Sequence, residues 1–235
     1  GGTLRYAGST NIMGYNNAAR GFTVASGGAV FEVVTSGVTW NLYRDSLSNY
    51  QSVFNGDLTL TGAGNGVMQH VIANGALLKT GAGTWTLSGA NTYTGGTTIS
   101  VGTLKVGSAT ALGANASAVS IASGAALDLN GQTMTNTNAL TLNGTGITNT
   151  GALTNSSATS STYAGSVSLA SATSIGSTAG AITISGAIYD ANNYGLALIG
   201  NKAITLSNTG NTLSTIASGS SLGALSVVNA GDLTI

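Results

Sequence analysis

Few residues in this sequence could perform nucleophilic chemistry, and they lie far apart. Gly219 to Gly223 reads G-x-S-x-G with Ser221 at its centre, the pattern around the nucleophilic serine of many hydrolases. That chemistry needs a strand-to-helix turn and a histidine base. No helical pattern follows Ser221, and the chain has one histidine, His70. We therefore interpret the segment as a glycine-rich corner and His70 as a polar surface or satisfied interior residue.

Metal and cofactor chemistry also lacks the residues it needs. Cysteine is absent, the aspartates follow no regular period, and Arg44 with Asp45 is the one adjacent charged pair. Zinc sites, calcium-binding repeats and polysaccharide-cleaving centres each require a cluster or period of such groups. The glycine runs at 62–66 and 81–83 lack the helix or P-loop lysine of a phosphate cradle. We expect no catalytic residue, no metal and no cofactor, and predict that the chain is not an enzyme.

Two surface features could bind a ligand. Trp40, Tyr43 and Tyr50, with Phe54 nearby, could form a platform on which sugar rings stack, or they could serve core and inter-subunit packing. Thr-x-Thr pairs recur, for example Thr59 with Thr61, and stacked pairs could bind ice or a crystalline glycan. Their intervals are irregular, so ice binding is a remote alternative. Action on polysaccharides is equally remote, because the acidic residues are isolated in the sequence.

The elements that must position these side chains are strands. Apolar residues recur at every second position with Thr or Ser between them, flanked by Gly, Asn or Ser, and this alternation indicates a strand with one buried face. No amphipathic helix is evident. The predicted strands are 58–60, 85–87, 104–106, 119–121, 127–129, 140–142, 167–169, 182–184, 204–206 and 233–235.

Successive strands and corners recur with the rhythm of a solenoid. We predict an all-β fold, a parallel β-helix spanning residues 1–235 as a single domain, with coils of roughly 20 to 25 residues and roughly ten coils in all. Residues 129–141 and 142–154 match at 9 of 13 positions. Whether this 13-residue repetition is two sides of a coil or a local duplication stays open. Residues 1–57 carry six of the twelve charges and eight of the thirteen aromatics.

Composition excludes other classes of protein. Six cations balance six anions, so no basic track for nucleic acid exists. No apolar run is long enough for a transmembrane helix, and the first residues do not resemble a signal peptide. A mean hydropathy of +0.29 at zero net charge indicates a folded chain.

Residues 77 to 107, LLKTGAGTWTLSGANTYTGGTTISVGTLKVG, closely resemble the autotransporter-associated β-strand repeat of large bacterial surface proteins. The resemblance implies an exported, right-handed β-helix, located extracellularly or on a bacterial cell surface, with an adhesive or structural role and no enzymatic site. A whole autotransporter also has a signal peptide and a C-terminal membrane barrel, so we expect the chain to be a piece of a longer protein or a passenger-derived subunit.

The two ends suggest how the rod could function. Neither end shows a capping helix, and an uncapped β-helix exposes unpaired backbone groups. We therefore expect the protein's main partner to be itself, through end-to-end stacking into a filament or as consecutive modules of a longer rod. The alternative is an adhesin stalk that binds a glycan or a cell surface. The candidate self-assembly residues are Gly2, Thr3, Leu4, Tyr6, Leu233 and Ile235.

Overall fold

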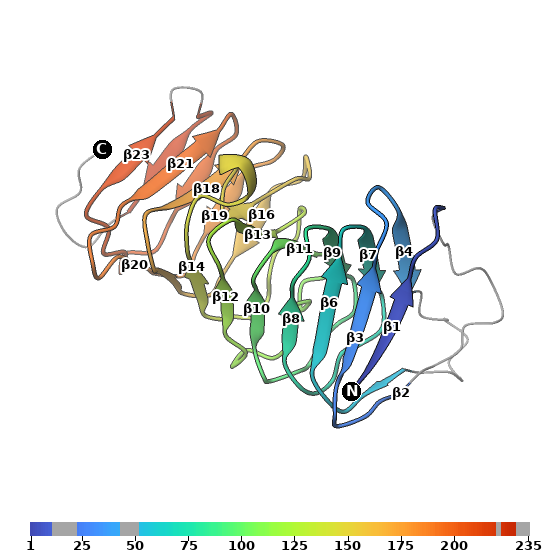
Figure 1. Ribbon diagram of the computed structural model, residues 1–235. Helices are drawn as coiled ribbons and strands as arrows, with labels where there is room; N and C mark the ends of the chain where they lie inside the picture. The colour runs from blue at the N-terminus through green and yellow to red at the C-terminus, as the bar shows by residue number, and fades with distance from the viewer. Residues whose placement is uncertain (11–22, 43–51, 220–221, 229–235) are drawn as a thin grey trace.

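A computed structural model describes residues 1–10, 23–42, 52–219 and 222–228 of the protein. In these residues the chain winds into a parallel β-solenoid, and its strands stack in sequence order from one end to the other (Figure 1). The predicted all-β, parallel β-helix is therefore confirmed. The one helical element in the described part of the chain is a short 3-10 turn, η1 (Ile147–Asn149).

Two long sheets and one shorter sheet form the walls of the solenoid. The first has nine strands, β1 (Gly2–Tyr6), β3 (Ala29–Val33), β6 (Leu58–Gly62), β8 (Leu77–Lys79), β10 (Thr97–Ile99), β12 (Val119–Ile121), β14 (Leu140–Leu142), β17 (Val167–Leu169) and β20 (Ile188–Tyr189). The second has nine, β4 (Thr39–Leu42), β7 (Asn65–Met68), β9 (Thr84–Leu87), β11 (Gly102–Val106), β13 (Ala125–Asp128), β15 (Leu153–Thr154), β18 (Thr173–Ser177), β21 (Leu196–Gly200) and β23 (Ile216–Ser218). The third has four, β16 (Ser161–Tyr163), β19 (Ile182–Ile184), β22 (Ile204–Leu206) and β24 (Leu225–Val227), and β2 (Thr23–Val24) pairs with β5 (Val53–Phe54).

The described solenoid has about eight turns, slightly fewer than the roughly ten predicted. Coil length varies along the chain. The coil that brings Leu77 opposite Leu58 is short, whereas the coil that brings Leu58 opposite Ala29 is about one and a half times as long. At about 4.8 Å for each strand spacing, eight turns extend about 38 Å.

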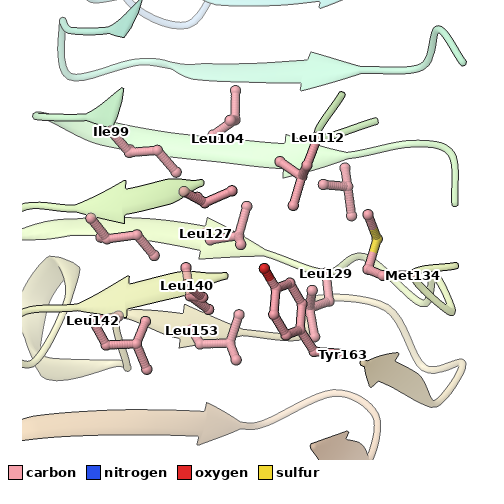
Figure 2. Close-up of a cluster of buried hydrophobic side chains, with 14 of the residues drawn as sticks. Ile99, Leu104, Leu112, Leu127, Leu129, Met134, Leu140, Leu142, Leu153 and Tyr163 are labelled. Carbon is pink, nitrogen blue, oxygen red and sulfur yellow. The ribbon is translucent and has the colours of Figure 1, made fainter. Parts of the chain in front are cut away.

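Alternating side chains build one continuous core. The strand Leu104-Lys105-Val106 buries its two apolar residues, and the same pattern holds along most strands of both long sheets. Figure 2 shows side chains from both sheets gathered in this cluster, among them Ile99, Leu104 and Leu127. Nine of the ten predicted strands overlap observed strands, and 233–235 lies outside the described residues.

Buried asparagines tie neighbouring coils together at the corners. Asn91 is 2% exposed; its Oδ1 accepts a hydrogen bond from the Ile72 N–H at 2.9 Å and its Nδ2 donates to the Ala111 carbonyl at 2.7 Å. One side chain therefore bonds to the coil before it and to the coil after it. Such bonds satisfy backbone groups that the sheets leave unpaired. Asn138, Asn155 and Asn211 are also buried and bonded to backbone groups.

The duplicated segments each form half of a coil. Residues 129–141 lead from the end of β13 in the second sheet to β14 in the first, and residues 142–154 lead back to β15 in the second. Leu127 and Leu153 then lie opposite each other, one turn apart. Of the two interpretations left open by the sequence, two sides of one coil is the observed arrangement.

Candidate binding surfaces

The predicted aromatic platform is only partly within the described residues. Trp40 on β4 is half-buried, and its ring centroid lies 6.1 Å from that of Tyr6 and 6.1 Å from that of Phe31. These spacings are typical of packed aromatic pairs. The arrangement favours the packing interpretation for Trp40. Tyr43 and Tyr50 lie outside the described residues.

The N-terminal end of the stack exposes an edge strand. Gly2, Thr3 and Leu4 on β1 pair with β3 on one side, and β1 is the last strand of its sheet among the described residues. Leu4 occupies the same inward-facing column as Phe31, yet it is 46% exposed because no further described coil covers it. A hollow of about 360 Å³ lies beside it. The other candidate end residues, Leu233 and Ile235, lie outside the described residues.

The Thr-x-Thr pairs do not stack into a two-column array. Thr59 lies between Val30 and Leu78 of the neighbouring coils, and Thr61 lies opposite Glu32. The third sheet does carry a single outward hydroxyl column. Its members are Thr162, Thr183, Thr205 and Ser226. An ice- or crystal-binding face needs matched columns, so these described strands do not favour that remote alternative.

The described side chains that could act in acid–base chemistry lie apart from one another, and they already interact with other groups of the protein. Asp128 is 3% exposed, accepts hydrogen bonds from the Asn130 and Ser156 N–H groups and pairs with Lys105 at 3.2 Å. His70 is 4% exposed and has interactions of its own. Among the described residues, no three His, Asp or Glu side chains are close enough to share a metal ion. Ser221 lies outside the described residues.

A buried lysine, Lys79, is a feature that our sequence analysis missed. It occupies the inward-facing column between Leu60 and Ile99 and is 0% exposed. Its Nζ donates to the carbonyls of Gly81 at 2.6 Å and Val101 at 3.0 Å, at the corner between the two long sheets. Burial lowers the pKa of Lys79 from 10.5 to about 8. Strand alternation was the available signal, because it places residue 79 on the same inward face as Leu77.

A second hollow, on the outer face of the second sheet, was also missed from the sequence. We call it the Tyr194 hollow; it has a volume of about 310 Å³. It is lined by Thr145, Thr173, Tyr194, Ala197, Thr215 and Ala217, among others. These residues come from four successive coils, which is why no local motif marks it. No helix in the described part of the chain is long and apolar enough to cross a membrane.

Comparison with known proteins identifies the central repeat. Residues 77–106 match the family model of the passenger-associated-transport repeat. Over 130 residues, 55% of this chain, the sequence is 35% identical to "Adhesin BmaC autotransporter" of Brucella suis biovar 1 (strain 1330). The chain spans 3% of the length of that relative. No solved structure gives a significant match.

These matches agree with the solenoid architecture and with the residues on which the resemblance was based. Lys79, Gly81 and Gly83 of the matched segment form the corner between β8 and β9, and Trp85 and Leu87 face the core. The matched segment thus spans about one and a half turns of the stack, from β8 through β11. The chain carries an autotransporter passenger repeat within a parallel β-solenoid, and its location is extracellular or at a bacterial cell surface.

Proposed function

We propose that this chain is a non-enzymatic segment of a surface adhesin, a rigid solenoid whose lateral walls bind a glycan or a cell surface. The observation that carries the proposal is the stack itself, in which a single buried cluster extends through the described coils. Parallel strands that each pair with the next coil cannot bend independently. Such a rod holds its side walls at fixed positions away from an anchoring surface.

The chemistry of the wall supports contact with neutral partners. On the first sheet, the outward column of described residues from β6 to β20 contains no charged side chain. Its members are Thr59, Leu78, Thr98, Ser120, Thr141, Ser168 and Tyr189. A wall of hydroxyl and small apolar groups can hydrogen-bond and pack without the desolvation cost of charges. The similarity to an adhesin is consistent with this role.

A bead-attachment experiment tests the proposal. Microspheres coated with the 235-residue chain are applied to cultured epithelial cells, with and without enzymatic removal of surface glycans, beside microspheres coated with an inert globular protein. We expect attachment above the inert control, reduced after deglycosylation. Attachment equal to that of the inert beads would overturn the proposal.

End-to-end stacking is the second candidate, favoured by the exposure of Leu4 on the open edge of β1. A second copy seated on this edge would continue the column that Phe31 and Leu60 begin. Leu4→Lys places a charge in that contact, whereas Leu78→Lys places one on the side wall, where Leu78 is 37% exposed. We expect filaments in negative-stain electron microscopy that Leu4→Lys abolishes and Leu78→Lys retains. Monodisperse monomers at high concentration would exclude the non-covalent form of stacking.

A further inference from the structure

We propose that the Tyr194 hollow is a binding site for a neutral glycan, with one sugar ring packed on the Tyr194 side chain. The proposal rests on the adhesin function proposed above and assigns that function to a specific site. Four features carry it: the shape of the hollow, the fixed position of Tyr194, the uncharged lining and the available hydroxyls.

Small outward-facing residues and a bulging loop create the hollow. In register along the second sheet, Ser174 lies opposite Ala197, and Ala197 lies opposite Ala217. The short side chains of Ala197 and Ala217 leave the wall low at this point, whereas Ser174 is 2% exposed and does not line the hollow. Beside them, residues 143–152 bulge outward through η1 and pack on β18 (Figure 1), where the Ser174 N–H donates to the Gly144 carbonyl and the Ala152 N–H donates to the Ser174 carbonyl. The hollow is open to solvent, and its volume, about 310 Å³, is at the lower end of small-molecule sites, roughly 300 Å³ and above.

A buried carboxylate holds the loop that presents Tyr194. Asp190 is 3% exposed; its Oδ1 accepts from the Tyr194 N–H at 2.8 Å, and its Oδ2 accepts from the Gly195 N–H at 3.0 Å and from the Ser214 hydroxyl at 3.0 Å. The backbone at Tyr194 is therefore held in place, while the residue is 42% exposed and lines the hollow. An exposed aromatic ring on a fixed backbone loses little conformational entropy when a ligand packs on it.

The chemistry of the lining favours a neutral sugar. No charged side chain is among the described residues that line the hollow, since the Asp190 carboxylate is buried behind the loop and already accepts three hydrogen bonds. An anionic glycan would find no cation in this lining. The aliphatic face of a pyranose matches an aromatic ring and methyl groups. Thr145 and Thr215 at the edge are exposed; the Thr215 hydroxyl can bond with sugar hydroxyls, and the Thr145 Oγ1, which donates to Asn149 Oδ1, can still accept from them.

The test measures saturation-transfer NMR between the 235-residue chain and three probes, lactose, N,N′-diacetylchitobiose and the anionic 3′-sialyllactose. Two variants alter the hollow: Tyr194→Ala removes the ring, and Ala217→Leu fills the floor at an exposed position. Val101→Ala is the control, because Val101 is similarly exposed (47%) but lies at the corner between β10 and β11, outside the hollow and outside the wall column described above. Circular dichroism checks that each variant keeps its β-solenoid fold.

We expect transfer to at least one neutral disaccharide, reduced by about tenfold in Tyr194→Ala and Ala217→Leu and unchanged in Val101→Ala. Transfer to 3′-sialyllactose should be no larger than transfer to lactose. Absence of transfer to both neutral probes, or equal transfer in the wild type and Tyr194→Ala, would overturn the site. If coated beads attach to cells equally well with and without Tyr194→Ala, the adhesin function stands and the site fails; if wild-type beads do not attach, the adhesin function itself fails.

Discussion

The short coils of the passenger repeat (residues 77–106) and the longer coil from Leu127 to Leu153 differ in the roles of their residues. Trp85 lies opposite Leu104 after a short coil, whereas Leu127 lies opposite Leu153 after a coil about a third longer. In the short coils, glycine corners stack directly on the backbone of the coil before. In the long coil, the extra residues bulge outward over β18 and help to form the Tyr194 hollow. The extra residues of a longer coil are therefore free to form a surface, while glycines of the coil that follows, such as Gly176, still contact the coil before.

The largest expected effect comes from a short-coil corner. A Cβ on Gly83 would lie 1.8 Å from the Gly64 carbonyl oxygen, so Gly83→Ala must separate two coils. We expect a loss of about 3–5 kcal/mol in the free energy of unfolding, measured by urea denaturation. Gly124→Ala is the control in a longer coil: nothing lies within 4 Å of its Cβ, but its φ is +81°, so we expect a smaller loss from backbone strain. That loss should be about 1 kcal/mol. Equal losses would contradict the importance of direct corner stacking.

Next in size is the loss of a buried asparagine between coils. Asn91→Ala leaves the Ile72 N–H and the Ala111 carbonyl without their partner inside the corner. We expect a loss of about 2–3 kcal/mol, because two buried backbone groups become unsatisfied. Asn208→Ala serves as the comparison, since Asn208 makes similar bonds near the surface, where water can replace them. Its loss should stay below about 1 kcal/mol in the same urea experiment. A similar loss for both variants would argue against the role of burial.

Alternation and glycine corners were sufficient to predict the strands, but not the position of every residue around the coil. The segment Thr-Asn-Thr occurs at 135–137 and at 148–150, with Ala and Leu following in both copies, yet the second copy contributes to η1 and places Thr148 and Asn149 at positive φ. The two copies differ because the second packs across β18 rather than along the stack. Local sequence does not contain that tertiary contact.

Binding surfaces were harder to predict for the same reason. The Tyr194 hollow combines residues from four coils, whereas sequence patterns are most informative within one. Trp40 stands out in the sequence as an aromatic residue with two interpretations, but its contacts with Tyr6 and Phe31 depend on the register between β1, β3 and β4. The register between strands of neighbouring coils can be assigned only when the coil lengths are known, and these lengths vary along the chain.

The buried lysine of the short coils predicts an alkaline rise in stability. The folded protein releases the Lys79 proton near pH 8, where its pKa lies, whereas the unfolded chain keeps it to about 10.5. Between these values the unfolded state binds more protons, so the free energy of unfolding rises with pH, by on the order of 1–3 kcal/mol. Burial also raises the pKa values of Tyr93 and Tyr163 above the ordinary 10, so stability should fall again above about pH 10.

Denaturation series from pH 7 to 11 check this profile. Lys79→Met should remove the rise between pH 8 and 10, because no group at this position then releases a proton early in the folded state. Lys202→Met, at an exposed position, should retain it. A rise of the same size in Lys79→Met would show that another group causes it.

The smallest expected effects come from two ion pairs that differ in burial. Arg5 and Glu32 pair at 3.1 Å near the N-terminal end, where the side chains are 59% and 29% exposed, so solvent and salt screen their attraction. Arg5→Ala should change the free energy of unfolding by less than about 0.5 kcal/mol. Lys105→Ala should cost about 1–2 kcal/mol, because the nearly buried Asp128 carboxylate loses its cation. The loss stays moderate because the Asn130 and Ser156 N–H groups still bind the carboxylate. Repeating both measurements at high salt should leave the order unchanged, and a larger loss for Arg5→Ala would contradict the dependence on burial.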